Sequence, residues 1–245
     1  QSMRELQKTQ SRKKRFWKED AVVQTEDGYK VTLDGHAIRT PSKSALIVRY
    51  KSIAEQIADE WMAQEEEVDP ATMPATRMVN SVIDKVSVNS DAIIEMLTEY
   101  AASDLICYRS LSPQELIEEQ AGLWDPLMHW TATVMNAPMV STNGVMFVSQ
   151  AEASVDEYRK QLNGMNIYQL AGVHDLITIS GSIVISFALI TNHITFDQAW
   201  MAATVDEAWQ EKQWGSDEEA QEALNKKRGD FEFAYNFWNN ASSHH

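Results

Sequence analysis

VVQTEDGYKVTLDGHAIRT, residues 22–40, decides the fold class of the first part of the chain. It holds short runs rich in β-branched and aromatic side chains, separated by Asp27-Gly28 and Asp34-Gly35. Asp-Gly pairs are strong signals for two-residue hairpin turns, because they tolerate the positive φ that such turns need. Residues 45–48 add a further apolar run. We therefore predict a small antiparallel meander, which must pack on something else, since a few short strands are marginally stable alone.

The sequence after this meander predicts helices. Ser52 and Glu55 have the spacing of a capping box that opens a helix through about residue 66. Asp69-Pro70 and Met73-Pro74 then interrupt the pattern, because proline favours extended backbone in the residue before it. The predicted class is α+β, with a small N-terminal antiparallel β domain followed by a larger all-helical C-terminal domain. Its parts are a basic flexible arm at 1–15, a β-rich domain with a following helix at 16–66, a linker at 67–75 and a helical domain at 76–245.

Residues 176–196 form an uncharged run that is long enough to cross a bilayer, so a membrane-spanning helix is one possible interpretation. Serine, threonine and asparagine interrupt it, and Asp175 and Asp197 border it closely. Apolar side chains on every side of a helix are typical of the middle of a bundle. We therefore expect a buried helix and no stable membrane insertion. Residues 231–238 fit either a strand or a helix, and the helical surroundings favour a helix.

Composition narrows the class of protein. The 245 residues include 21 Lys and Arg against 36 Asp and Glu, a net charge of −15. A phosphate backbone would be repelled by most of this surface, so we expect no nucleic-acid partner. Cys107 is the only cysteine, which excludes an intrachain disulfide and fits a reducing compartment. Basic residues cluster at the start of the chain, a pattern typical of a solvated terminus: Arg4, Lys8, Arg12, Lys13, Lys14, Arg15 and Lys18.

The sequence lacks the usual catalytic signatures. It has no glycine-rich phosphate loop, nucleophile elbow or His-Glu-x-x-His pair. Its scattered histidines have no metal-ligand spacing, so we predict no metal and no cofactor. Asp104 and Asp125 lie near aromatic residues and could serve acid–base chemistry. Because neither has an evident companion base, a capping or hydrogen-bonding role is favoured.

The most informative group lies in the helix predicted from Asp206 to Gly215, DEAWQEKQWG. Glu207 is two helical turns from Trp200 on one side and from Trp214 on the other, with no evident cation on that face. Three roles are open: a catalytic acid, a structural acid bonded within the core, or an anchor for a partner protein. The chain also has eight Trp and eleven Met. Although most of these belong in a core, Trp and Met also supply protein-binding surfaces, so a protein-binding factor is favoured.

Several short motifs follow one another in a recognisable order across most of residues 15–220. They are Arg15-Phe16-Trp17-Lys18, Tyr29-x-Val31-x-Leu33-Asp34-Gly35, Arg39-Thr40-Pro41-x-Lys43, Ala58-x-Glu60-Trp61-x-x-Gln64, Met73-Pro74-x-Thr76, Asp104-Leu105-x-x-Tyr108-Arg109, Gln120-x-x-x-Trp124-Asp125-Pro126, and Asp206-Glu207-x-Trp209-Gln210-x-x-x-Trp214-Gly215 with Asp217. Together they resemble an assembly-chaperone family that serves the alpha subunit of the catalytic head of the F-type ATP synthase. The chain departs from this family at Trp17, His36 and Ala75, where the family usually has Tyr, Arg and Leu. His36 lacks the permanent cation of the family residue.

The resemblance implies a non-enzymatic chaperone that binds the unassembled alpha subunit and hands it over for assembly with beta. Free alpha exposes apolar surface that beta later covers, and exposed apolar patches aggregate. The family's functional acidic position falls on Glu207. The partner-binding residues implied are Glu207, Trp200, Trp209, Trp214, Asp206 and Asp217.

Two rival functions stay open. One is a small hydrolase that uses paired carboxylates among Asp104, Asp125 and Glu207; the other is a general peptide-binding or regulatory module. A hydrolase needs a closed pocket with two nearby carboxylates, whereas a chaperone needs an exposed groove or patch. The sequence shows no targeting peptide, which favours the bacterial cytoplasm over the mitochondrial matrix.

Overall fold

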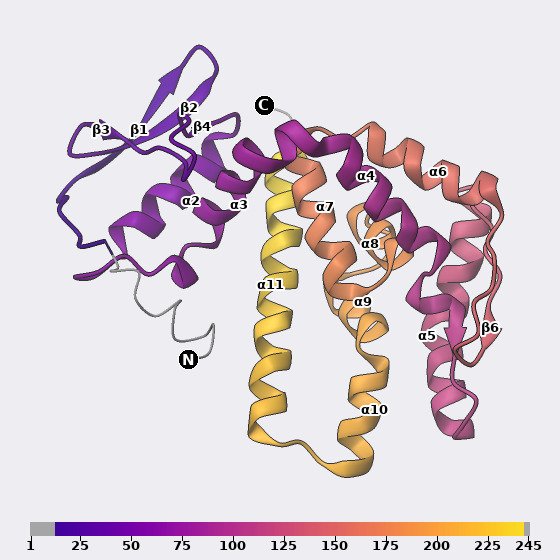
Figure 1. Cartoon of the computed structure of the whole chain (residues 1–245). Coiled ribbons are helices and arrows are strands. Elements are labelled where there is room, and N and C mark those ends of the chain that lie inside the picture. The colour runs from indigo at the N-terminus through magenta and orange to yellow at the C-terminus, as the bar shows by residue number, and fades with distance from the viewer. Residues whose placement is uncertain (1–12, 243–245) are drawn as a thin grey trace, which may run out of the picture. The chain divides into compact units, whose positions relative to one another are not determined.

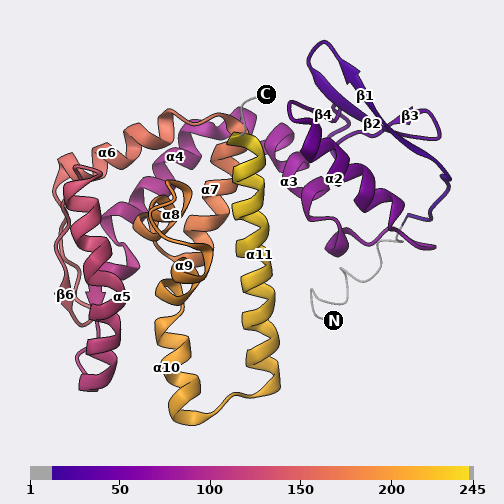
Figure 2. The same cartoon turned by 180° about the vertical axis from the view of Figure 1, so that it is seen from behind.

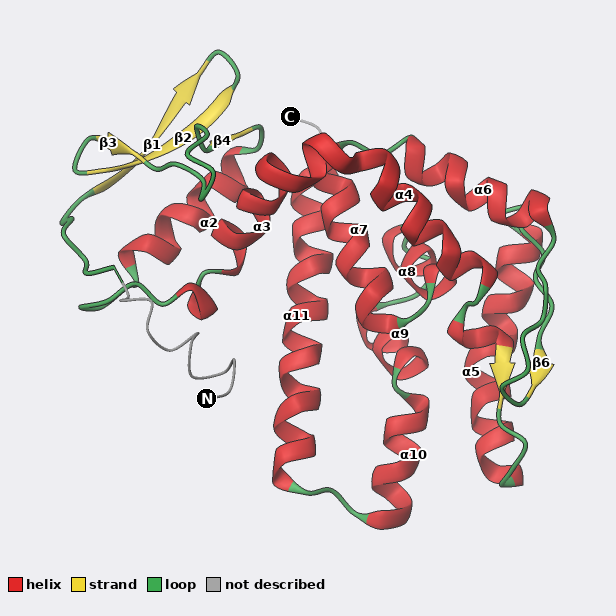
Figure 3. Cartoon of the chain, viewed as in Figure 1, coloured by secondary structure: helices red, strands yellow, loops and turns green. Residues whose placement is uncertain are grey.

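A computed structural model of the chain describes residues 13–242 (Figure 1). The chain divides into two compact units, residues 1–87 and 88–245. The four-stranded sheet belongs to the first unit, and most of the helices belong to the second (Figure 3). This arrangement confirms the predicted α+β class, with a small antiparallel N-terminal sheet and a larger helical region.

The first unit is built around the strand β2, which pairs with β1 on one side and with β3 and β4 on the other. All of these pairings are antiparallel. The strands are β1 (Asp20–Thr25), β2 (Gly28–Leu33), β3 (His36–Ala37) and β4 (Ile47–Val48).

One of the two predicted turns forms as expected, and the other shifts by one residue. Asp34 and Gly35 both have positive φ, 48° and 80°, and join β2 to β3. Before β2, residues 26–27 form the loop, and Gly28 is already paired in the strand. A Cβ on Gly28 would lie 2.4 Å from the carbonyl oxygen of Val48. Glycine is therefore favoured there both by the close approach of β4 and by its φ of 145°.

The predicted helix after the meander is α2 (Lys51–Met62), and it supplies the packing that the small sheet needs. Its buried face presents Ile53, Ala54, Ile57 and Ala58. These residues recur at three- and four-residue intervals, so they form one stripe along the helix. The remaining elements of this unit are the 3₁₀ helix η2 (Pro70–Thr72), α3 (Pro74–Ser81) and the π-helical turn η3 (Val82–Val86).

Residues 67–75, which the prolines predict as a linker, fold back on α2 inside the first unit. The Gln64 side chain accepts a hydrogen bond from the Asp69 amide (2.7 Å) and donates one to the Thr72 hydroxyl (2.9 Å). The Glu60 carboxylate accepts hydrogen bonds from the amides of Ala75 and Thr76, each at 2.7 Å. It therefore caps the start of α3. The two-unit division falls later than the predicted boundary, between residues 87 and 88, because these contacts hold the proline segment in place.

The predicted basic arm at 1–15 is only partly covered by the structure. Arg4, Lys8 and Arg12 lie outside the described residues. Residues 13–15 run beside residues 66–68: the Val68 amide donates to the Lys13 carbonyl (2.8 Å), and the Arg15 amide donates to the carbonyl of Glu66 (2.9 Å). This end of the predicted arm is therefore tied to the first unit by backbone hydrogen bonds.

The second unit is helical, and its long helices α7 and α11 pack along one another (Figure 2). A Cβ on Gly172 of α7 would lie 3.3 Å from the backbone nitrogen of Trp238, which shows how closely they approach. Residues 231–238 are helical, as favoured. The elements are α4 (Ser87–Ala102), η4 (Leu105–Cys107), β5 (Tyr108–Arg109), α5 (Gln114–Thr133), β6 (Thr142–Asn143), α6 (Glu152–Asn163), α7 (Ile167–Ser180), α8 (Ile183–Ile190), α9 (Phe196–Ala203), α10 (Val205–Trp214) and α11 (Glu218–Ser242).

We expected the apolar run 176–196 to form one helix. It instead contains the end of α7, the whole of α8 and the turn that leads to α9. Gly181 has a φ of 73° and ends α7, and Ser182 caps α8 through a hydrogen bond from the Ile185 amide (3.0 Å). Asp104, fully buried, accepts hydrogen bonds from the Ser182 hydroxyl (2.6 Å) and the Val184 amide (3.1 Å). A glycine that tolerates the left-handed region thus breaks the helix, and a remote carboxylate stabilises the new start. The predicted burial holds for α8, where Ile183–Leu189 are all buried, but residues 191–193 are exposed.

Across residues 13–242, no helix combines the length and the apolar character that a bilayer crossing requires.

Candidate functional site

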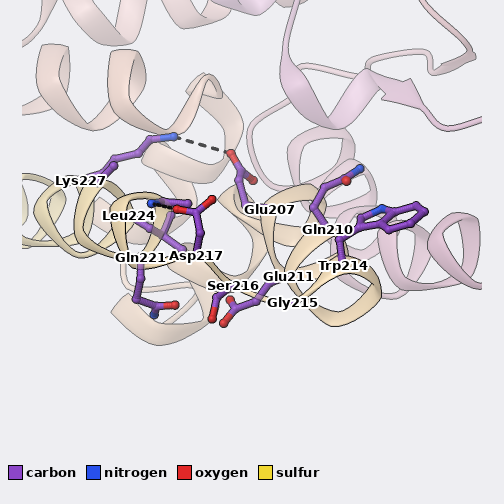
Figure 4. Close-up of a pocket in the computed structure, with 12 residues that line it drawn as sticks. Glu207, Gln210, Glu211, Trp214, Gly215, Ser216, Asp217, Gln221, Leu224 and Lys227 are labelled. Carbon is purple, nitrogen blue, oxygen red and sulfur yellow. Dashed lines mark hydrogen bonds and ion pairs between the residues drawn. The ribbon is translucent and has the colours of Figure 1, made fainter.

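The candidate site is an open groove of about 500 Å³ between α10 and α11 (Figure 4). The two helices are joined by residues 215–217, and Gly215 has a φ of 76°, which favours glycine. Apolar and charged side chains from both helices line the groove. They include Glu207, Gln210, Glu211, Trp214, Asp217, Gln221, Leu224 and Lys227.

Glu207 is exposed on the first turn of α10 and points across the groove toward α11 (Figure 4). Its Oε1 lies 3.8 Å from Nζ of Lys227, and the side chains of Glu207 and Lys227 are 46% and 39% exposed. The sequence showed no cation on this face of α10, and the cation beside Glu207 comes from the next helix, α11. Periodicity within one helix cannot reveal such a neighbour. Exposure leaves the carboxylate accessible to a partner.

The three tryptophans predicted around Glu207 have different environments. Trp214, at the end of α10, is 83% exposed and lines the groove. Trp209 is buried, and so is Trp200, whose ring centroid lies 5.7 Å from that of Phe231. Trp200 belongs to α9, which is separated from α10 by the non-helical Thr204. Trp214 is therefore available for contact with a partner, whereas Trp200 and Trp209 pack inside the helical unit.

The two aspartates predicted at the site are engaged within the protein. Asp206 accepts a hydrogen bond from the Gln120 side chain (2.8 Å), which ties α10 to α5. Asp217 lines the groove and caps α11, since its Oδ1 accepts a hydrogen bond from the Ala220 amide (2.7 Å). Capping an N-terminus with a carboxylate is favourable for both hydrogen bonding and the helix dipole. Both residues position the groove, and Asp217 also forms part of its rim.

The structure does not bring the candidate catalytic carboxylates together. Asp104 is buried at the start of α8, and burial raises its pKa to about 6 against the hydrogen bonds that it accepts. Asp125 is exposed and pairs with Arg109 (Nη1 to Oδ1, 2.8 Å). Burial likewise raises the pKa of the Cys107 thiol, to about 12. In the described part of the chain, no group of three or more His, Cys, Asp or Glu side chains is arranged to hold a metal ion.

The half of the groove that α11 contributes was not predicted from the sequence. Leu224 and Lys227 line it three residues apart, which is the spacing of neighbours on one helix face. That spacing could have marked one face of α11. It could not have shown that this face lies opposite Glu207, because the pairing of α10 with α11 depends on the intervening turn.

An open groove with an exposed aromatic side chain, an apolar floor and a charged rim has the features of a protein-binding surface. The fold and the site thus present a candidate protein-binding surface on two adjacent helices.

A family profile described as ATP12 chaperone protein matches residues 14–132. The structure of Atp12 from Paracoccus denitrificans is 36% identical, with a TM-score of 0.88, covering 93% of this chain and 98% of that one. The Agrobacterium tumefaciens protein Atu1473 is 34% identical, with a TM-score of 0.88, covering 93% of this chain and 85% of that one. Protein atp12, mitochondrial, of Schizosaccharomyces pombe is 24% identical over 225 residues, 87% of this chain and 77% of its own length.

The chain therefore belongs to the ATP12 chaperone family, a family of ATP synthase assembly chaperones. The resemblance first drawn from the short motifs is confirmed.

Proposed function

We propose that this protein is a non-catalytic chaperone that binds the unassembled alpha subunit of the F-type ATP synthase catalytic head. It covers the alpha surface that later meets beta, prevents its aggregation, and releases it when assembly proceeds. Family membership and the sequence resemblance support the choice of client. The observation that carries the binding mode is Trp214, 83% exposed on the rim of the groove that Glu207 also lines.

The groove suits a client that must later be released. Trp214 supplies a large apolar anchor, and Glu207, Glu211 and Lys227 supply polar contacts that remain solvated in the free chaperone. A few anchors inside a polar rim are typical of non-obligate interfaces, whereas permanent interfaces are more apolar. Such a surface can hold alpha without a permanent seal.

The compartment follows from the client. The relatives include proteins from bacteria and a mitochondrial protein. We place the protein where alpha subunits meet beta: the bacterial cytoplasm or, alternatively, the mitochondrial matrix.

The test is selective binding to purified alpha over purified beta. The wild-type chain should retain alpha and reduce its aggregation, and Glu207→Lys should lose both effects because it reverses the charge beside Lys227. Glu99→Lys, an equal charge change at an exposed position on α4, is the matched control and should bind normally. Equal retention of alpha and beta, or no retention of alpha, would overturn the proposal.

A further inference from the structure

A second exposed apolar cluster lies in the loop between α5 and α6, away from the groove lining. Val145, Met146 and Phe147 follow one another and are 97%, 77% and 70% exposed. Leu111, in the turn before α5, is 72% exposed, and its Cδ1 would lie 3.5 Å from a Cβ on Gly144. We define the loop cluster as Leu111, Val145, Met146 and Phe147. Scattered exposed apolar residues are ordinary, but a contiguous group marks an interaction surface.

The loop is held in place at several points by hydrogen bonds. At its base, the Gln150 side chain accepts from the Val140 amide (2.9 Å) and donates to the Val140 carbonyl (2.8 Å). Further along, β6 pairs in parallel with β5, and the Gly144 amide donates to the Arg109 carbonyl (2.7 Å). These contacts fix both ends of the exposed run. These hydrogen bonds order the loop before a partner binds. Less conformational entropy is therefore lost on binding.

The start of α5 connects the loop cluster to α10, because Leu111 lies in the turn just before α5 begins. In the projection of Figures 1 and 2 the first half of α5 is seen between β6 and α10. Lys212, two residues before Trp214, forms an ion pair with Glu119 of α5 (3.5 Å). The hydrogen bond from Gln120 to Asp206 (2.8 Å) joins the same two helices. A client that contacts both the groove and the loop cluster would have to span the first half of α5.

The negative charge of the helical unit indicates which kind of partner the loop cluster can bind. Residues 130–151 carry no charged side chain, yet they belong to a unit, residues 88–245, that holds 22 of the 36 Asp and Glu but only 7 of the 21 Lys and Arg. A second copy of this chain, or an anionic lipid surface, would bring like charges together. The acidic residues of this unit instead complement a protein surface that is apolar at its centre and lined by Lys and Arg. These acidic residues include Glu115, Glu118 and Glu119 at the start of α5 and Glu211 near the end of α10.

We propose that the loop cluster is a second docking site for the same client that occupies the α10–α11 groove, and that it receives an apolar client surface bordered by basic residues. This inference rests on the proposed function and extends it, because two separated contacts on one client act at a high effective concentration. Losing either contact weakens binding without abolishing the fold.

The experiment measures the affinity of the full-length chain for purified alpha subunit with the double substitution Met146→Ser and Phe147→Ser. We expect the dissociation constant to rise at least tenfold, because two exposed apolar side chains lose their contacts. Val88→Ser is the matched control: Val88 is 73% exposed on α4, and its replacement should leave affinity unchanged. Both variants should melt within about 2 °C of wild type, since surface substitutions rarely change stability further.

The outcomes separate the two proposals. If the wild-type chain does not bind alpha, the proposed function is overturned. If it does bind, and the loop variant binds within twofold of wild type while Trp214→Ala weakens binding, the groove acts alone and the loop cluster is not a docking site. Wild-type self-association or binding to anionic vesicles that the double substitution abolishes would show a different occupant, and would also overturn the inference.

Discussion

Glu207 on α10 and Lys227 on α11 face one another across an open groove, with Oε1 and Nζ 3.8 Å apart. Both side chains are too exposed for this pair to contribute much to folding, since exposed ion pairs are worth about 0–1 kcal/mol. Their position on the groove lining is what gives them a role. A partner that enters between the helices meets a carboxylate and an ammonium group that are already close together.

Reversing the charges of Glu207 and Lys227 distinguishes the role of Glu207 in client binding from its role in folding stability. Glu207→Lys alone places two ammonium groups together and should lower the free energy of unfolding by less than about 1 kcal/mol. Adding Lys227→Glu restores an opposite-charge pair, and stability should recover. If the client recognises the carboxylate on α10, alpha binding should stay lost in the double variant. Denaturant titration and a binding isotherm on the same samples test this, and recovery of binding in the double variant would contradict the assignment to Glu207.

Two tryptophans five residues apart should respond in opposite ways. Trp214→Ala removes a side chain that is 83% exposed, so the unfolding free energy should change by roughly 0.5 kcal/mol or less while affinity for alpha falls at least tenfold. Trp209→Ala removes a side chain that is 5% exposed and should destabilise the helical unit by about 3–5 kcal/mol. Urea unfolding followed by circular dichroism, beside a binding assay, checks both. A stable Trp209→Ala variant would show that this ring is not part of the packing.

Asp104 should make stability fall as pH rises. Burial raises its folded-state pKa to about 6 from the ordinary value of 3.8, so the folded protein holds this proton more tightly than the unfolded chain. The resulting stabilisation is fully present below pH about 4 and is lost as pH rises through 6. Asp104→Asn cannot ionise, so the difference in unfolding free energy between wild type and variant should shrink between pH 4 and pH 7. Paired urea titrations across that range test the sign, and a growing difference would contradict it.

Glu60 should be a strong determinant of stability in the first unit. Its carboxylate accepts hydrogen bonds from the Ala75 and Thr76 amides and the Thr76 hydroxyl, and its burial raises its pKa. Glu60→Ala leaves those donors without an acceptor and should cost about 2–3 kcal/mol. Glu55→Ala, on the same helix, removes only an exposed 3.8 Å pair with Lys51 and should cost under about 0.5 kcal/mol. Thermal melts of both variants give the comparison, and equal effects would refute the capping role.

Local patterns were sufficient where a structure depends on neighbours in sequence. The Asp34-Gly35 turn formed as predicted because its two positive φ values are a property of those two residues. The helical character of residues 231–238 also agreed with the favoured alternative. The first turn lies one residue earlier than predicted: Gly28, with a φ of 145°, already pairs with Thr25 and lies against Val48, twenty residues away in the sequence. The prediction failed where a long-range contact decided the conformation.

The same distinction applies to the candidate site. The sequence alone determined that an acidic helix carries Glu207 and Trp214, and its motifs alone indicated the chaperone family. Tertiary structure decided that Trp214 is exposed while Trp200 and Trp209 are buried, and that Lys227 stands opposite Glu207. Helical periodicity places side chains around one axis, but exposure and cross-helix pairing depend on which other elements pack against that axis. Those contacts join residues far apart in the chain, and no spacing within a single segment records them.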